Sequence, residues 1–514
     1  MIPSRFAAYF WAGLDVLNAL VPGLRRLQEA GFVSTARIVM SPVRTHDDDI
    51  YHFDQEFADQ VAGVPFLPAA VRSTQYQKAF ALPSLHTFVL TANDSASFDH
   101  LFAADGSGPA WLEANADLVR DEYREMTVAL YETQKWTGKR FIVCFWEGDS
   151  VLYWPVLVPP FTVPSFPQPV VIPGGLRDPP SSVVDFRYRA LKRWCQLRQE
   201  GIKHGRIIAR SKGWGGIEVN DAIEFNSLYY RKEERKCHPQ NGFLIRDTLH
   251  DIIRVVHPDY ASYSAWESTY RGRLFDDIQT IRQFLQRETN GHTQLIIGEL
   301  GVTGHSDPSK PTPKDSLYSK SWQYIQSAHA ANRAKIPVIV LWKAWDPFNI
   351  FEGEGLFNAD GTERQILKNL QASFRSPVPS FESPIKISGV LDQFDMNGSR
   401  SADGKRYFEV YGNFPGTREG NADVPGWMGG YRAIINFSTR SFLDIPTWGE
   451  SGGQINIGLV PIPRAVVWFL LQFRRLVDNK LSNRYGPIRL NRIPPRSTKC
   501  LDLVTQRYWA YYGS

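Results

Sequence analysis

Two short runs of the sequence each end in a glutamate that could take part in acid–base or covalent chemistry. They are Phe141-Ile-Val-Cys-Phe-Trp-Glu-Gly-Asp149 and Gln294-Leu-Ile-Ile-Gly-Glu-Leu-Gly301. Both are apolar, have the length of a strand and stop at a carboxylate flanked by glycine, as expected where a buried parallel strand delivers an acid to the rim of a sheet. A pair of carboxylates such as Glu147 and Glu299 is the minimum set for cleaving a glycosidic bond, because one protonates the leaving oxygen and the other attacks the sugar.

The separation of the two glutamates predicts a barrel. If a strand and its helix take roughly 30 to 50 residues, Glu147 and Glu299 lie about three strands apart in a barrel of eight. The runs that end at these glutamates supply two strands, and the other six are predicted at Ala7–Gly13, Thr35–Met40, Thr87–Thr91, Asp221–Asn226, Tyr260–Ser264 and Pro337–Trp342. Helices are predicted at Val16–Ala30, Ala114–Thr137, Ser182–His204 and Arg364–Ser373. The alternation indicates an α/β fold, a (β/α)8 TIM barrel over residues 1–375.

Two proline-rich segments interrupt this pattern. The first, Val151–Pro180, can be neither regular helix nor inner strand, and we expect a long loop on the same rim as Glu147 that shapes a substrate groove. The second marks a stiff linker over residues 376–388. Short strands with Gly and Asn between them then predict an all-β immunoglobulin-like sandwich and tail over residues 389–514. Its strands are expected at Tyr407–Tyr411, Tyr431–Phe437, Gln454–Leu459 and Val466–Phe473.

Composition excludes several classes of function. The net charge of +5 on 514 residues gives no basic stripe for nucleic acid. The sequence has no nicotinamide, nucleotide, zinc-protease or serine-hydrolase motif, and its four scattered cysteines indicate neither a zinc site nor a disulfide framework, so no cofactor or metal is expected. The cluster His46-Asp-Asp-Asp49 is interpreted as a solvated loop. The apolar stretch Phe6–Leu20 is interrupted by Asp15, so we expect no secretion signal and no membrane insertion. That favours a cytoplasmic protein or one assembled into a virion.

The sequence resembles a large clan of retaining glycoside hydrolases, in which the acid/base lies at the end of strand four and the nucleophile at the end of strand seven. Within that clan it is similar to a set of bacterial and phage-associated barrel proteins. The residues that carry this resemblance, over about residues 1–375, are Phe145-Trp-Glu-Gly-Asp149, Ile223-Glu-Phe-Asn226, Asp259-Tyr-Ala-Ser-Tyr-Ser-Ala-Trp266, Ile297-Gly-Glu-Leu-Gly301 and Leu341-Trp342. Residues 385–495 resemble immunoglobulin-like modules of the IPT/TIG kind, through Tyr411-Gly-Asn-Phe414, Gln454-Ile-Asn-Ile-Gly-Leu459 and Leu481-Ser-Asn-Arg-Tyr-Gly-Pro487.

The resemblance implies a catalytic role for each glutamate. Glu147 is expected to be the acid/base, with its pKa raised by Trp146, Phe145 and nearby negative charge. Glu299 is expected to be the nucleophile, held ionised by nearby donors. The alternative for each is an ordinary surface or structural carboxylate. Carboxyl groups more than about 10 Å apart would exclude a glycosidase.

Further residues are expected to contact a sugar. The Tyr263 phenol would donate to Glu299, and Trp342 would form the floor under the sugar, although both could be core residues. Asn226, Arg37 and Glu224 are expected at the rim, together with Asp149. The clan usually has Asn directly before the acid, where this chain has Trp146. Either Asn226 or Asn93 supplies the contact with the sugar hydroxyl, or the chain does not hydrolyse the usual sugars.

Two classes of function follow from these residues. The first is a glycosidase that acts on a polysaccharide or cell-surface glycan, with the β module as a spacer or docking domain. The second is a non-catalytic carbohydrate-binding or structural protein, for example a phage virion component. The expected partners are a carbohydrate and, in the second case, other virion proteins or further copies of this chain. An open groove across the barrel mouth would favour the first.

Overall fold

The structure is a computed structural model of the whole chain. It describes residues 2–42 (except 12, 13 and 15), 51–154, 179–226, 228, 246–270, 274–301, 324–345 (except 326) and 355–375 (except 359), and otherwise short strands between 156 and 177 and between 385 and 510. The cluster His46–Asp49 lies outside the described residues.

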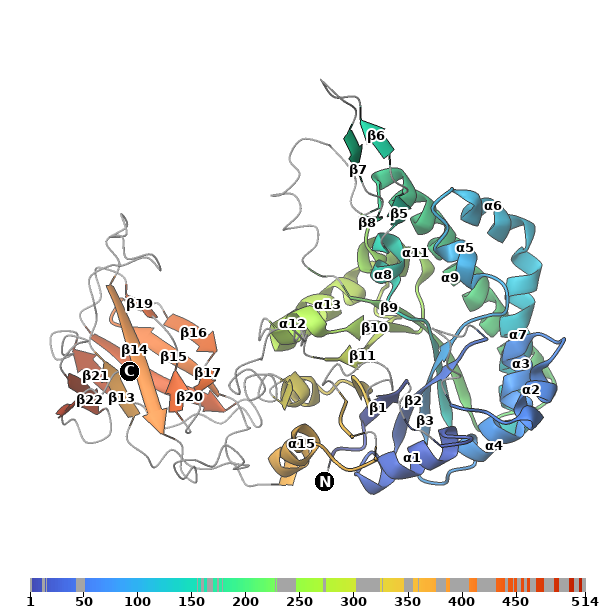
Figure 1. Cartoon of the computed structure of the whole chain (residues 1–514). Coiled ribbons are helices and arrows are strands. Elements are labelled where there is room, and N and C mark those ends of the chain that lie inside the picture. Colours follow the sequence, from blue (N-terminus) through green and yellow to red (C-terminus); the bar gives the residue numbers. More distant parts are fainter. Residues whose placement is uncertain are drawn as a thin grey trace.

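Eight strands close into a barrel, shown in Figure 1. They are β1 (Phe6–Phe10), β2 (Thr35–Met40), β3 (Thr87–Ala92), β4 (Arg140–Cys144), β9 (Glu218–Phe225), β10 (Tyr260–Ser264), β11 (Gln294–Leu300) and β12 (Ile339–Leu341). All eight pairings are parallel, and β1 closes the ring by pairing with both β12 and β2. Every predicted barrel strand is present in the predicted order, so the (β/α)8 barrel is confirmed.

Helices follow the strands and lie around the outside of the barrel in Figure 1. In chain order they are α1 (Leu20–Glu29), α2 (Gln55–Val61), α3 (Phe66–Arg72), α4 (Thr74–Phe80), α5 (Phe98–Leu101), α6 (Ser107–Ala114), α7 (Ala116–Gln134), α8 (Gly148–Tyr153), α9 (Ser181–Ser211), the π-helical turn η1 (Thr248–Ile253), α11 (Arg254–Val256), α12 (Trp266–Tyr270), α13 (Leu274–Glu288) and α15 (Gln365–Arg375). The barrel strands are almost wholly buried, as expected for a parallel sheet covered by helices.

The longest helices, α7 and α9, pack closely against each other. On α7 the buried positions Val119, Tyr123, Met126 and Leu130 recur at helical spacing and form the inner face. On α9, a Cβ at Gly201 would lie 2.3 Å from the Arg120 carbonyl oxygen, so the glycine permits the close approach of the two backbones. Trp194 of α9 packs against Phe145, two residues before Glu147, with ring centroids 4.6 Å apart.

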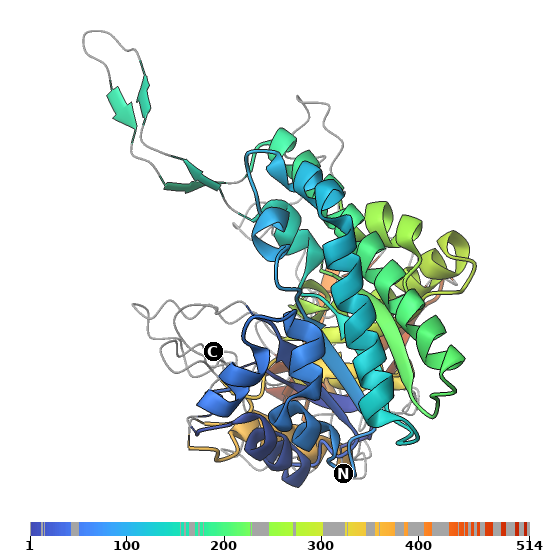
Figure 2. The same ribbon diagram turned by 90° about the vertical axis from the view of Figure 1, so that its right-hand side faces the viewer.

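The proline-rich segment is more structured than the long loop predicted for it. Its first residues form α8, and four short strands follow, β5 (Val156–Val158), β6 (Phe161–Val163), β7 (Val170–Ile172) and β8 (Gly175–Arg177). β5 pairs with β8 and β6 pairs with β7, both antiparallel. Neither pair joins the barrel, in agreement with the exclusion of proline from inner strands. In Figure 2 these strands extend away from the barrel.

The C-terminal strands form two antiparallel sheets. One has seven strands in the order β17-β18-β14-β13-β22-β23, with β19 also paired to β14, and the other has four, in the order β16-β15-β20-β21. Their bounds are β13 (Ile385–Ser388), β14 (Arg406–Asn413), β15 (Tyr431–Phe437), β16 (Phe442–Pro446), β17 (Trp448–Glu450), β18 (Gln454–Asn456), β19 (Val460–Ile462), β20 (Trp468–Arg475), β21 (Tyr485–Arg489), β22 (Lys499–Asp502) and β23 (Tyr508–Ala510). Because β13 pairs with β14 and β22, residues 385–388 belong with this module rather than with the predicted linker. The immunoglobulin-like topology stays a prediction.

No helix in the described part of the chain is long and apolar enough to cross a bilayer.

Candidate active site

A β-bulge directs Glu299 into the barrel. Tyr263 of β10 pairs with Ile297 of β11, yet the next residue, Ser264, pairs with Glu299, so Gly298 is the extra residue on β11. A Cβ at Gly298 would lie 2.0 Å from both the Glu224 carboxylate and the Ser262 hydroxyl. Only glycine fits there, and the bulge lets two successive residues of β11 face the barrel interior.

The carboxyl groups of Glu147 and Glu299 lie close together at the carboxyl ends of β4 and β11. The Ser264 hydroxyl oxygen lies 2.5 Å from Oε1 of Glu147 and 3.3 Å from Oε2 of Glu299. These two carboxylate oxygens are therefore at most about 5.8 Å apart, the sum of the two lengths. This upper bound is well inside the limit of about 10 Å, and it is compatible with the roughly 5 to 5.5 Å of retaining glycosidases.

Glu147 directly precedes α8, three residues beyond the end of β4, and is surrounded by hydrogen-bond donors. Besides Ser264, the Ser150 hydroxyl donates to its Oε2 at 2.6 Å. The Asn226 amide, which follows β9, donates to the same oxygen at 3.1 Å. Asp149 holds this arrangement by accepting from the backbone N–H of Asn226 at 2.9 Å. Asn226 is thus at the site, as predicted, but its amide contacts the proposed acid directly.

Arg37 and Glu224 form a buried ion pair beneath the two carboxyl groups. The guanidinium donates twice to Glu224, at 2.9 and 3.1 Å, and also to the Gly298 carbonyl at 2.7 Å. Both side chains are fully buried. Arg37 lies 3.5 Å from Oε1 of Glu299 and over the ring of Tyr9. The charge of Arg37 is largely matched by Glu224, so it compensates Glu299 only in part.

The pKa values of both candidate carboxyls are raised. Burial, followed by repulsion from Glu224 and Glu147, raises the pKa of Glu299 well above its usual range, against the opposing effects of Arg37 and Trp266. Burial also raises the pKa of Glu147, although hydrogen bonds from Ser150 and Ser264 oppose it. The raised pKa of Glu147 has the predicted direction. Glu299 departs from the prediction of a carboxylate held ionised, because burial and two negative neighbours outweigh its donors.

Aromatic rings surround the Glu299 side of the site. The Trp266 indole N–H donates to Oε2 of Glu299 at 3.2 Å. Trp342 follows β12 and lies edge-on to Trp266, with ring centroids 5.8 Å apart. It also contacts Tyr9 and Trp11, and it is only partly buried. A part-exposed indole next to a carboxyl group is suited to packing against a sugar ring.

The structure places Tyr263 outside this cluster. Its hydroxyl hydrogen-bonds with Ser268 at 2.5 Å, and Ser268 donates to Asp277 on α13. The predicted contact with Glu299 is replaced by this one because side chains alternate along a strand, so that Ser262 and Ser264 face the interior while Tyr263 faces the helices. Ser264 is the residue of β10 that touches the nucleophile candidate.

Trp146 and Asn93, which were also named from the sequence, each have a side-chain contact in the structure. Trp146 packs edge-on against Trp154, with ring centroids 5.7 Å apart. Asn93 donates to Ser41 at 3.0 Å. The sequence reasoning missed Ser150, Ser262, Ser264 and Trp266. The last three lie within the run Asp259–Trp266, so a position at or just after the end of a strand was an available signal, but a serine or tryptophan there has many other uses.

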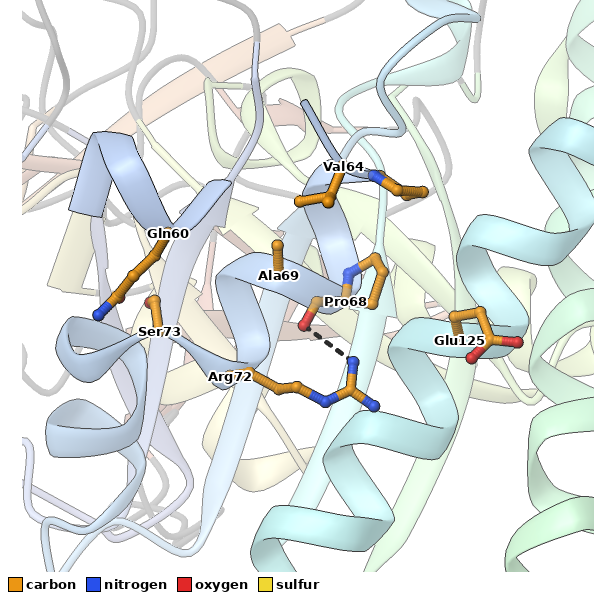
Figure 3. A pocket seen from close by; sticks show the side chains of 8 residues that line it. Gln60, Val64, Pro68, Ala69, Arg72, Ser73 and Glu125 are labelled. Carbon is orange, nitrogen blue, oxygen red and sulfur yellow. Dashed lines mark hydrogen bonds between the residues drawn. The ribbon is translucent and has the colours of Figure 1, made fainter. Parts of the chain in front are cut away.

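The described residues include no group of three or more His, Cys, Asp and Glu side chains that could hold a metal ion. A surface hollow of about 500 Å³ lies elsewhere, between the helices on the outside of the barrel. Figure 3 shows Pro68, Ala69 and Arg72 of α3 on one side of it and Glu125 of α7 on the other. It is separate from the carboxyl cluster and has none of its groups.

No protein-family model and no curated protein sequence matches the chain. Similar solved structures are barrel glycoside hydrolases. A family 1 β-glucosidase from Thermotoga maritima is 10% identical, with a TM-score of 0.40, over 68% of this chain and 86% of that one. An endo-β-1,4-mannanase from Thermotoga petrophila is 9% identical, with a TM-score of 0.37, over 93% and 96%.

An FMN-binding β-glucuronidase from Facaelibacterium prausnitzii L2-6 is 12% identical, with a TM-score of 0.34. The match covers 94% of this chain and 56% of that one, so the chain spans little more than half the length of that enzyme. With TM-scores below 0.5 these similarities carry no argument about activity. The barrel is established by its own strand pairing.

Proposed function

We propose that the chain is a retaining glycoside hydrolase that acts on a polysaccharide or cell-surface glycan. The observation that carries this proposal is the single Ser264 hydroxyl within hydrogen-bond distance of both Glu147 and Glu299. An upper bound of about 5.8 Å between two of their oxygens supports a reaction in which one carboxyl attacks the anomeric carbon while the other protonates the leaving oxygen.

The proposed reaction has two steps. Glu147 gives its proton to the glycosidic oxygen as the bond from that oxygen to the anomeric carbon breaks, and Glu299 forms an ester bond to the same carbon. Water then attacks this carbon, Glu147 accepts a proton from the water, and the bond to Glu299 breaks. Two displacements restore the original anomeric configuration. The first step needs Glu147 protonated and Glu299 ionised, which suits a buried pair whose charges repel each other.

Sugar contacts in this proposal come from both sides of the pair. Trp342 and Trp266 would pack against the sugar ring on the Glu299 side, and Asn226 would contact a hydroxyl on the Glu147 side. The strands β5–β8 that follow α8 would extend the substrate-binding surface. Arg37 and Glu224 are fully buried next to the two carboxyl groups, so they would influence the pKa values of the pair rather than touch the sugar.

The test is hydrolysis of a glycan panel and of activated aryl glycosides by wild type, Glu299→Gln and Glu147→Gln. Glu299→Gln should lower turnover by several orders of magnitude while leaving folding and sugar affinity nearly intact, because the amide is isosteric but cannot form the ester. Glu147→Gln should lose less turnover on activated aryl glycosides, because their leaving groups hardly need protonation.

Glu122→Gln is the matched control. Glu122 is a buried glutamate that accepts hydrogen bonds from the Leu67 backbone N–H and from Ser95, away from the site. Its substitution should leave turnover unchanged. NMR of the first product formed should show retained anomeric configuration, and inversion would refute the assignment of Glu299 as nucleophile.

A non-catalytic, carbohydrate-binding or structural role is the second proposal, with a phage particle as one setting. The two antiparallel sheets outside the barrel favour it, since a module of the immunoglobulin-like type is suited to docking. The glycan panel distinguishes the catalytic proposal from the non-catalytic one. If wild type binds a glycan yet releases no product from it or from any aryl glycoside, the enzyme proposal is to be abandoned.

A further inference from the structure

Ser264 is the residue through which Glu147 and Glu299 are connected. It is the last residue of β10 and is fully buried. Its hydroxyl oxygen is within 3.3 Å of one oxygen of each carboxyl group, but it carries a single hydrogen and can donate to only one of them at a time. The other carboxyl completes the second hydrogen bond only if it is protonated and donates to the Ser264 oxygen.

The donors around the two carboxyls are unequal. Glu147 accepts two short hydrogen bonds, at 2.5 Å from Ser264 and 2.6 Å from Ser150. Glu299 has contacts at 3.2 and 3.3 Å on Oε2, and its Oε1 is buried without a hydrogen-bond partner. Short bonds from hydroxyl groups favour the ionised form. Glu147 is thus the better place for the negative charge when no ligand is bound.

The remaining charged groups that face the pair do not reverse this preference. Arg37 of β2 is 3.5 Å from Glu299 but is bound twice by Glu224 of β9. Glu224 repels both carboxyls, and Asp149 of α8 repels Glu147. The titratable side chains of Tyr9 and Cys144 also lie next to Arg37 and Glu224, and burial raises the pKa of each, so both stay neutral.

We propose that Ser264 makes the two carboxyls hold one proton between them, on Glu299 at rest, and passes it to Glu147. In the transfer, the proton on Oε2 of Glu299 moves to the Ser264 oxygen while the hydroxyl hydrogen of Ser264 moves to Oε1 of Glu147. Ser264 is a hydroxyl group before and after, and no other reactant is needed. A ligand oxygen that accepts a hydrogen bond from Glu147 would favour the second arrangement.

The significance for catalysis rests on the proposed function, but the proton arrangement does not. A retaining hydrolase needs Glu147 protonated and Glu299 ionised, which is the arrangement after the transfer. Ser264 would then be a positioning residue that widens the pH range over which the pair holds one proton. This range is the interval between the two macroscopic pKa values of the pair.

The test is a pH titration of the protein labelled with ¹³C at the glutamate side-chain carboxyls. The two resonances are assigned by their loss in Glu147→Gln and Glu299→Gln. In wild type, Glu299 should carry the proton between the two titration steps. Ser264→Ala should narrow the interval by about one to two pH units, because one charge-assisted hydrogen bond to the singly protonated pair is lost.

Two comparisons separate this effect from the loss of any buried hydroxyl. Ser268→Ala removes a buried hydroxyl that contacts Tyr263 and Asp277, and it should leave the interval unchanged. Ser264→Thr and Ser264→Val have the same shape and differ only in the hydroxyl, so the interval should be wider in the threonine variant. This pair also serves if the alanine variant does not fold.

An unchanged interval in both Ser264→Ala and Ser264→Val would overturn the proposal, as would equal narrowing in Ser268→Ala. So would a wild-type protein in which Glu147, rather than Glu299, is protonated between the two steps. These readings need no substrate. If the protein titrates as expected but hydrolyses no glycan, the role of Ser264 in proton transfer stands and only the proposed function is refuted.

Discussion

Replacing Arg37 with methionine should destabilise the barrel strongly, since it leaves Glu224 as a buried charge without its cation. Methionine has a similar length, is unbranched and can fill the space between the strands. The guanidinium makes two hydrogen bonds to Glu224 and one each to the Gly298 carbonyl and the Thr91 hydroxyl. All of these are lost in the variant.

The size of the effect follows from burial. Both side chains of the pair are 0% exposed, and breaking such a pair by removing one partner costs about 3 to 5 kcal/mol. Removing both charges costs far less, so Arg37→Met with Glu224→Gln should recover most of the loss. The Arg140–Glu218 pair, between neighbouring strands at 2.6 Å, is the matched control. Its side chains are 37% and 58% exposed, and Arg140→Met should cost less than about 1 kcal/mol.

The measurement is urea unfolding at neutral pH, followed by tryptophan fluorescence, for wild type, Arg37→Met, Glu224→Gln, the double variant and Arg140→Met. The coupling energy comes from the double-mutant cycle. A loss below about 1 kcal/mol for Arg37→Met would refute the reasoning, because a desolvated pair cannot be broken so cheaply. A double variant no more stable than Arg37→Met would show that the unpaired Glu224 charge is not the cause.

Two further predictions concern Glu299 and its bulge. The folded protein raises the pKa of Glu299, so the folded state keeps a proton that the unfolded chain releases above about pH 4.3, and stability should fall as the pH rises from there through the folded-state pKa. Urea unfolding measured at several pH values should show a smaller fall in the free energy of unfolding for Glu299→Gln than for wild type. An equal pH dependence in the two proteins would contradict this prediction. Gly298→Ala should destabilise by about 1 to 3 kcal/mol or more, because its methyl group would lie 2.0 Å from Glu224 and Ser262. Unchanged stability and an unchanged Glu224–Ser262 contact in a crystal structure would count against that packing.

The barrel was predictable because its strands are continuous apolar runs. Because these strands are buried on both faces, the local sequence alone predicts them. The helices between successive strands predict that the strands are parallel. Helix lengths were less accessible: α9 runs to Ser211, beyond the predicted end at His204, because Gly205 packs against Thr127 of α7 and the helix continues past it. The β5–β8 pairs were missed, since strand pairs outside a sheet core leave a weak signal in a proline-rich segment.

The candidate site shows where reasoning from the sequence stops. The position of Glu299 at a strand end was accessible, but its direction depends on the extra residue Gly298, which reverses the alternation of β11 relative to β10. Without that bulge, the strand phase that turns Tyr263 towards the helices would turn Glu299 outwards as well. The same phase selects Ser264 instead of Tyr263 as the contact of the two carboxyls. The inserted glycine of β11 therefore turns Glu299 into the barrel, and the alternation of β10 presents Ser264 to it.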